Sequence, residues 1–169
     1  MMEMKDIIKQ VKKNKMKTLE DVEKIYELLR WHKDMIIRQP GEHIRGLVDM
    51  LAKKFSKFVS ESPEMYAGSP AVIFIDLMIV WLSLRTRTLK YVDDIVRASR
   101  SFHIRVVGQA LGSSDYADLL PYAGLLLEII LRNTKPEYVD TIIGELGAEN
   151  IGKLLRVPSR KILDTIGWS

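Results

Sequence analysis

Apolar residues recur along most of this chain at the three- and four-residue spacing of an amphipathic helix. Thr18 followed by Asp21 resembles a capping box, so the sequence predicts a helix that begins after Thr18. We expect it to end at Gln39, because Pro40 disfavours the helical conformation of the residue before it. A second helix is predicted from its apolar positions, which are Ile44, Leu47, Val48, Leu51, Phe55, Phe58 and Val59.

Two later segments are apolar on every side, as expected of helices buried by several neighbours. They cover residues 71–84, interrupted by Asp76, and residues 119–131, interrupted by Glu128 and with Pro121 expected in the first turn. Residues 88–111 between them have the pattern of one continuous amphipathic helix.

Further along, Pro136 is predicted to open another helix that runs to about Leu146. Alternation of period two is not sustained anywhere, so the predicted fold class is all-α.

A weak internal similarity appears at an offset of 47 residues, where an apolar helix, a short turn and an amphipathic helix recur in the same order. The recurring residues are Leu84, Arg85, Tyr91, Val92, Asp93 and Ile95, which return as Leu131, Arg132, Tyr138, Val139, Asp140 and Ile142. One step back, Ile37, Arg38, Ile44 and Val48 fall in the same register. The pattern leaves two architectures open: a helical bundle, or a short array of stacked helical hairpins.

The 169 residues suffice for one domain with a substantial core, and they include no cysteine. We expect a basic N-terminal helix or arm at 1–17 and a single all-α domain at 18–169. No apolar run reaches the roughly 20 residues of a bilayer span, and no signal peptide is evident. These features predict a cytoplasmic protein, or a virion protein if its source is a virus. Few Asn and Gln beside abundant Lys, Arg, Glu and Ile favour a thermophilic, archaeal source.

The modest net charge of +4 conceals a strong segregation of charge along the chain. Residues 1–17 and 85–105 each carry a net charge of +4, and residues 150–169 carry +3. Residues 115–149 carry −5. Basic segments separated by acidic ones indicate a polyanionic partner, nucleic acid first among them.

Motifs of common enzymes are absent, including phosphate-binding glycine loops and the His-Glu-x-x-His zinc signature. The two carboxylates within the apolar segments, Asp76 and Glu128, are open to a catalytic or metal-binding interpretation. The simpler interpretation places each on a solvated stripe or beside an arginine such as Arg85 or Arg132. We therefore predict a non-enzymatic protein with no cofactor and no metal site, and a hydrolase built on the two carboxylates is the third hypothesis.

The N-terminal segment predicts a basic amphipathic helix, since its lysines interleave with apolar residues. Such a helix suits a phosphate backbone, a protein partner or an anionic membrane surface, and it also suits plain packing on the domain. The candidate nucleic-acid-binding residues here are Lys5, Lys9, Lys12 and Lys13.

The second basic segment is richer in arginine, whose guanidinium group makes bidentate contacts with phosphate. The competing interpretation is an ordinary charged helix surface, neutralised by Asp93 and Asp94. The candidate residues are Arg85, Arg87, Lys90, Arg97, Arg100 and Arg105.

The third basic segment resembles a helix-turn-helix DNA-binding corner over residues 149–166. A small residue, Gly152, stands within the first helix, and the apolar Val157 and Ile162 stand at the turn and on the inner side of the second helix. The resemblance implies that Ser159, Arg160 and Lys161 open the recognition helix.

Two positions depart from that pattern, because Arg156 replaces the usual turn glycine and Thr165 an apolar residue. A corner that only covers the core is therefore the alternative. The candidate contacts are Lys153, Arg156, Arg160 and Lys161.

Together these patterns predict a structural protein that coats, packages or scaffolds nucleic acid, DNA in preference to RNA, through phosphate contacts. Self-association or contact with other subunits is expected of such a protein. The alternative is a non-enzymatic helical scaffold for protein–protein interaction.

Overall fold

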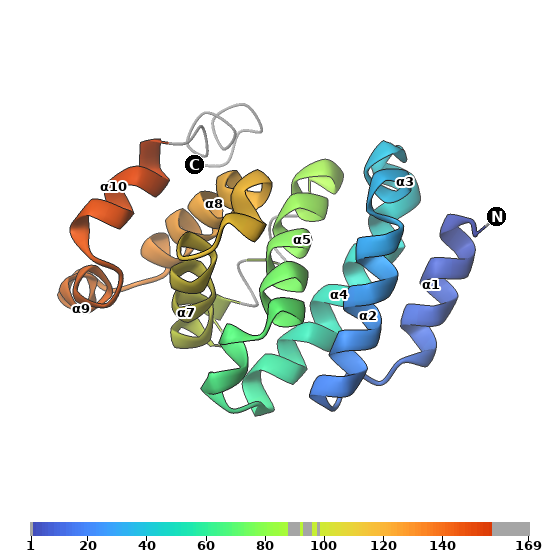
Figure 1. The fold of residues 1–169 in the computed structure, drawn as a ribbon, viewed down its shortest axis with the longest axis horizontal. Helices are drawn as coiled ribbons and strands as arrows, with labels where there is room; N and C mark the ends of the chain where they lie inside the picture. The colour runs from blue at the N-terminus through green and yellow to red at the C-terminus, as the bar shows by residue number, and fades with distance from the viewer. Residues whose placement is uncertain (1, 88–91, 93–95, 98, 157–169) are drawn as a thin grey trace.

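The structure is a computed structural model that describes residues 2–87, 92, 96–97 and 99–156 (Figure 1). Within these ranges its regular elements are all helices and it contains no strand, so the predicted all-α class is confirmed. The α-helices (α) and 3-10 helices (η) are α1 (Met4–Lys13), α2 (Leu19–Trp31), α3 (Lys33–Arg38), α4 (Gly41–Glu61), η1 (Glu64–Gly68), α5 (Pro70–Thr86), α7 (Arg100–Leu111), η2 (Ser114–Leu119), α8 (Leu120–Arg132), α9 (Pro136–Leu146) and α10 (Ala148–Arg156).

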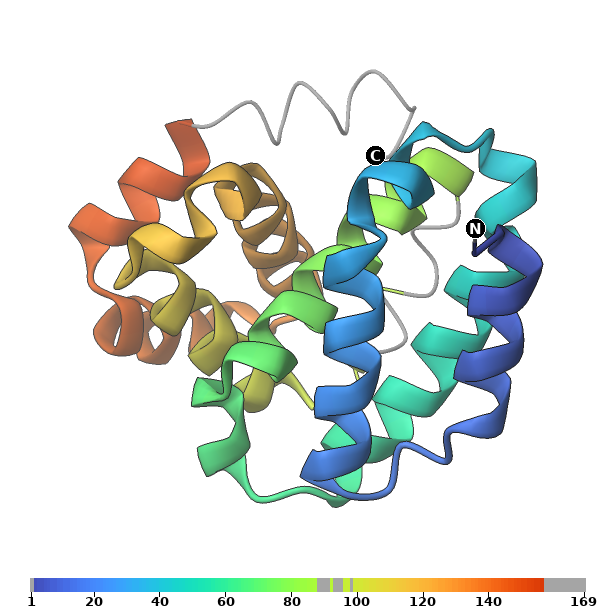
Figure 2. The same cartoon turned by 45° about the vertical axis from the view of Figure 1, so that its right-hand side comes forward.

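The helices stack as consecutive pairs in two rows. Helix α5 packs between α2 and α8, and α8 packs in turn on α10. In the other row α1 packs on α4, and α7 packs on α9. The pairs α4–α5, α7–α8 and α9–α10 are themselves in contact, so neighbours in sequence are neighbours in space. The molecule is elongated along this stack, with α1 at one end and α9 and α10 at the other (Figures 1 and 2).

Helices α5 and α8 occupy the middle of the stack and are buried nearly all round. Every residue from Ala71 to Val80 in α5 is buried, as is every residue from Ala123 to Ile130 in α8. The continuous apolar segments of the sequence are therefore the central helices of the core. None of the described helices combines the length and the hydropathy that crossing a bilayer requires.

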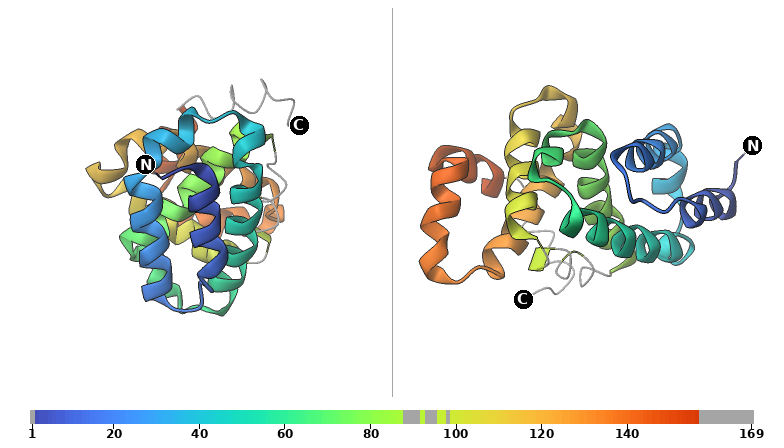
Figure 3. Two further views of the ribbon diagram at one scale, coloured as in Figure 1. Left: turned by 90° about the vertical axis from the view of Figure 1, so that its right-hand side faces the viewer. Right: turned by 90° about the horizontal axis from the view of Figure 1, so that it is seen from below.

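The basic N-terminal segment is part of the same core. Ile7, Val11 and Met16 are buried in the main hydrophobic cluster. The view along the stack shows α1 lying alongside α2 and α4 at this end of the molecule (Figure 3, left). Helix α1 is therefore packed on the core through its apolar side.

Three positions that the 47-residue offset aligns occupy equivalent places in the structure, each near the end of a helix. Ile37, Leu84 and Leu131 are all half-buried, one residue before an exposed arginine. Those arginines lie in the last turns of α3, α5 and α8.

Two continuous helices predicted from the sequence are each broken. The first bends at His32, which has φ −105° and ψ 13° and separates α2 from α3. The second is interrupted at Ser99, whose φ of −159° and ψ of 69° are not helical, so that α7 begins at Arg100. The hydrophobic pattern did not reveal either break, because apolar residues keep their helical spacing on both sides of it.

The expected helix starts are confirmed. Thr18 and Asp21 form a capping box, with the Asp21 amide donating to Thr18 Oγ1 at 3.1 Å. Backbone amides of Thr18 and Lys17 donate to the Asp21 carboxylate and lower its pKa. Pro121 and Pro136 stand in the first turns of α8 and α9.

The start of α4 crosses the end of α5 so closely that only glycine fits. A Cβ atom added at Gly41 would lie 2.5 Å from the backbone oxygen of Arg85. We expect Gly41→Ala to lower the free energy of unfolding by about 1–3 kcal/mol, because the two backbones must separate. Urea denaturation measures this, with Gly144→Ala as the control, since a Cβ there meets nothing within 4 Å. Equal stability of the two variants would contradict the close approach.

Candidate nucleic-acid interface

Basic side chains reach the carbonyl ends of several helices, where four backbone oxygens lack partners inside the helix. At the junction of α3, α4 and α5, Arg85 Nη2 donates to the Gln39 oxygen at 2.7 Å. In the opposite direction, Arg45 Nη2 donates to the Thr86 oxygen at 3.3 Å. Each cation also lies at the negative end of a helix dipole. The close contact at Gly41 is thus flanked by two reciprocal arginine bonds.

Two arginines, one in α7 and one in the segment before it, bind Asn133 at the end of α8. Arg100 Nη1 donates to the backbone oxygen of Asn133 at 2.9 Å, and Arg97 Nε donates to its side-chain oxygen at 2.9 Å. Arg105 Nε pairs instead with Glu64 of η1 at 3.1 Å. These three arginines were predicted to form one exposed, phosphate-facing surface. The structure gives each a partner within the chain, so we do not include them in the interface proposed below.

The end of α1 is capped by a lysine from α4. Lys54 Nζ donates to the backbone oxygens of Val11, Lys12 and Asn14 at 2.8, 2.9 and 2.6 Å. Partial burial lowers the pKa of this amine. Because one ammonium group satisfies three carbonyls of α1, the helix is fixed to α4 by polar as well as apolar contacts.

The lysines of α1 stay on the outside of the molecule. At about 100° per residue, Lys5, Lys9, Lys12 and Lys13 share one arc that lies opposite the buried Ile7 and Val11. We call these four residues the lysine face. All four are exposed. Lys5 pairs with Glu3 at 3.4 Å, whereas the other three form no salt bridge within the part of the chain that the structure describes.

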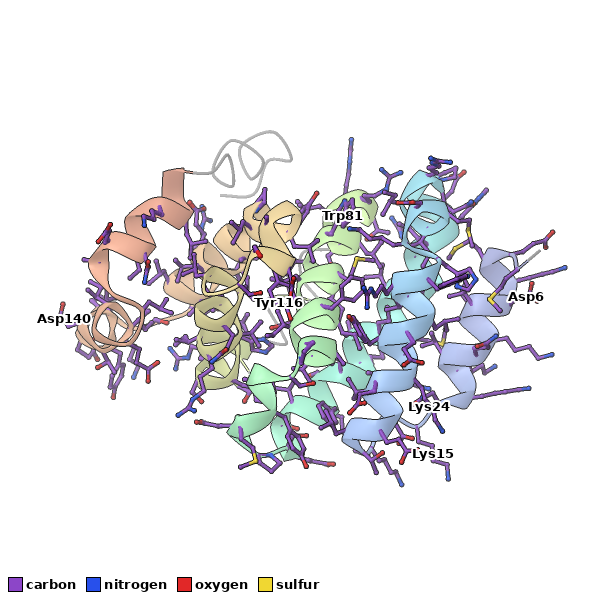
Figure 4. The ribbon with its side chains drawn as sticks, viewed as in Figure 1. Asp6, Lys15, Lys24, Trp81, Tyr116 and Asp140 are labelled. Atoms are coloured by element: carbon purple, nitrogen blue, oxygen red, sulfur yellow. The ribbon has the colours of Figure 1, made fainter. Side chains whose placement is uncertain are left out.

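A pocket of about 460 Å³ extends this basic region toward α2. Lys13, Lys15 and Lys24 line it, together with the carboxylate of Asp21. The side chains labelled Lys15 and Lys24 lie at the same edge of the molecule (Figure 4). Lys24 is partly neutralised by Glu20 at 3.9 Å. Sequence reasoning named neither Lys15 nor Lys24 as a site residue, because their approach depends on how α1 and α2 lie.

The remaining predicted contacts are dispersed. Arg87 is exposed at the end of α5 with a left-handed φ of 56°. Lys153 pairs with Glu149 at 3.5 Å on α10, and Arg156 is the last residue of that helix. Lys90, Arg160 and Lys161 lie outside the described residues. The second half of the helix-turn-helix-like corner, from residue 157 onward, lies outside them too.

The buried carboxylate Asp76 has a partner that the sequence did not suggest. His103 Nδ1 of α7 and Asp76 Oδ2 are joined by a hydrogen bond of 2.7 Å, and both side chains are almost completely enclosed. The predicted pairing with an arginine such as Arg85 is therefore wrong for Asp76, as is a solvated position. Nε2 of the same imidazole has no hydrogen-bond partner among the described residues. Neither side chain lines the pocket beside α1 and α2 or the pockets beside α7.

Glu128 of α8 is also buried, with 8% of its surface exposed, rather than on a solvated stripe. Across the described ranges, no three His, Asp or Glu side chains gather as a metal site.

Two adjoining pockets lie along α7 on the far side of the molecule from α1. One, of about 440 Å³, lies between η1, α7 and α9, and the other, of about 430 Å³, lies between α7 and α9. Ile104 and Glu145 line both, so the two pockets adjoin, and together we call them the α7–α9 groove. Met65 and Tyr138, which are 76% and 55% exposed, stand one in each pocket.

Comparison with family models, with curated proteins and with solved structures finds no match for the chain. Its function is therefore argued from its own residues.

The Asp76–His103 pair should be strongly coupled. Asp76→Ala should lower the free energy of unfolding by about 3 kcal/mol, since it leaves the imidazole buried without a partner. The double variant Asp76→Leu, His103→Leu should recover most of that loss, because both polar groups disappear together. A double-mutant cycle of Asp76→Leu, His103→Leu and the two combined, unfolded in urea, measures the coupling. Additive effects of the two single variants would contradict a direct bond.

The arginine contacts at the end of α8 should contribute to stability. Arg100→Ala should lower the free energy of unfolding by about 1–2 kcal/mol, because the terminal carbonyl loses a charged donor. Lys57→Ala, an exposed lysine on α4, serves as the control and should change stability by less than about 0.5 kcal/mol. An Arg100 variant as stable as the control would show that the guanidinium is free to face a ligand.

Proposed function

We propose that this protein is a non-enzymatic structural protein that binds nucleic acid, DNA in preference to RNA, through the lysine face of α1. It would coat, package or scaffold the nucleic acid with little reading of sequence. One observation carries the proposal: four exposed lysines share one arc of a terminal helix, and three of them form no salt bridge with described residues.

The geometry of α1 suits contact with a phosphate backbone. Lys5 and Lys13 stand eight residues apart, which corresponds to roughly 12 Å along the helix axis. A row of ammonium groups over that length can meet several successive phosphates, and each contact releases a condensed counterion. Lysine supplies a point charge without the planar fork of arginine, which suits binding that ignores base sequence.

The rigidity of α1 also supports this function. Its apolar side belongs to the core, and its last carbonyls are held by Lys54. The lysines are therefore displayed on a fixed scaffold, so binding does not have to order a free segment. Lys15 and Lys24 of the neighbouring pocket extend the positive surface beyond α1.

Neutralising the lysine face should weaken binding and flatten its salt dependence. The test variant is Lys9→Gln, Lys12→Gln, Lys13→Gln, titrated with labelled duplex DNA and single-stranded RNA by fluorescence anisotropy. The slope of log affinity against log salt should fall by roughly 0.9 for each lost contact with B-DNA. The parent protein should bind duplex DNA more tightly than RNA.

A matched control removes three positive charges elsewhere. Lys57→Gln, Arg132→Gln, Lys135→Gln changes exposed bases of α4, α8 and the residue before α9, so the net charge falls equally. This control should keep most of the affinity. Equal losses in the two triple variants would mean that only net charge matters, and no binding at low salt would overturn the proposal.

A scaffold for protein partners is the second candidate function, and the α7–α9 groove favours it. Exposed apolar side chains beside a groove are typical of protein-binding surfaces. The absence of nucleic-acid binding at low salt, with the fold intact, would favour this candidate over the first. The cytoplasmic or virion location and the thermophilic archaeal source stay predictions.

A further inference from the structure

The two ends of the helical stack carry opposite charge. At one end is the lysine face of α1. At the other end, α9 exposes Glu137, Asp140 and Glu145 and contains no basic residue. Asp140 projects from one extremity of the molecule, and Asp6 and Lys15 lie toward the opposite one (Figure 4). We call the three α9 carboxylates the acidic face.

The charges of α9 lack partners of their own. None of the three forms a salt bridge within the described part of the chain, whereas Glu149 on α10 is paired with Lys153 at 3.5 Å. Lys135 is the nearest basic residue in sequence and precedes the helix. At about 100° per residue, Glu137 and Asp140 lie on the side of α9 opposite its buried Ile142 and Leu146, whereas Glu145 lies at the edge that borders the α7–α9 groove. Glu137 and Asp140 therefore point away from the stack, as the lysines of α1 do.

Each end also presents apolar surface beside its charges. Tyr138 stands among the carboxylates with 55% of its surface exposed, and it borders the α7–α9 groove. On α1, Met4 and Ile8 are half-buried and lie next to the lysines around the helix. An aromatic ring beside carboxylates accepts a lysine both through its face and along its aliphatic stem.

We propose that the acidic face of one copy binds the lysine face of a second copy, so that the protein associates head to tail. The two faces lie at opposite ends and cannot meet within one molecule, so each copy has one unfilled face at either end. A contact of this heterologous kind repeats, and it produces a ring where the rotation closes and an open filament where it does not. The contact forms without nucleic acid, and because it uses the same lysine face as the function proposed above, a second copy and nucleic acid would compete for that face.

The association should be strongest at low ionic strength. Sedimentation velocity of the full chain without nucleic acid is expected to show oligomers at about 0.05 M salt that dissociate at about 0.5 M, where charges are screened within a few ångströms. A protein that is monomeric at low salt and high concentration would overturn the proposal. Because the experiment contains no nucleic acid, its outcome is independent of the function proposed above.

Charge reversal tests which faces meet. Lys9→Glu, Lys12→Glu, Lys13→Glu makes both ends acidic, and Glu137→Lys, Asp140→Lys, Glu145→Lys makes both ends basic. Each variant alone should associate at least about tenfold more weakly than the parent protein. Mixed in equal amounts, the two should associate again, since every acidic end then finds a basic one.

The mixing step separates a specific contact from loss of folding. Circular dichroism melting confirms that each variant is folded before it is used. Recovery on mixing supports the head-to-tail contact, because unfolded or merely repelled chains do not regain association in this way. Variants that associate like the parent, or a mixture that stays dissociated, would show that these faces do not bind one another.

Discussion

The arrangement of this molecule depends on cations that bind the carbonyl ends of helices. Arg45 and Arg85 link the ends of α3 and α5 in both directions, Lys54 closes α1, and Arg100 closes α8, where Arg97 binds the side chain of Asn133. Stacked helices bury their sides well, but their ends keep unpaired carbonyls that burial would penalise. A long basic side chain from an adjacent helix solves this problem and fixes the relative position of the two helices.

This use of basic residues divides the positive charge of the chain into two classes. The arginines near the middle of the stack are engaged with backbone or with Glu64, whereas the lysines at its N-terminal end face solvent. Total charge alone therefore says little about where a polyanion would bind, and the location of unpaired charge says more.

Much of the fold could be predicted from local patterns. The helix starts at Thr18, Pro121 and Pro136 follow from capping and from the fixed φ of proline, which act within a few residues. The break at Ser99 could not be predicted, since Val96 and Phe102 are buried on either side of it and sustain the helical spacing. Local patterns indicate which side of a helical segment is apolar, but they do not show whether the segment forms one continuous helix.

The candidate site was less accessible to such reasoning. The exposure of Lys9 and Lys12 follows from helical spacing, but the partner of Asp76 lies 27 residues away on another helix. The contacts of Arg97 and Arg100 are 36 and 33 residues distant, and each depends on which helix end lies beside the guanidinium. Pairings of that kind are decided by the rotation and offset of packed helices, which hydrophobic spacing does not specify.

The stacking of sequence neighbours has a consequence for how the chain reaches this structure. Consecutive helices such as α4 and α5, or α7 and α8, pack closely on one another, so many contacts form without the closure of a long loop. We expect rapid folding that nucleates on the pairs around α5 and α8, where apolar surface is densest, and spreads outward. Helix α1 packs mainly on α4 and stands at the edge of the stack, so it would join last and open first.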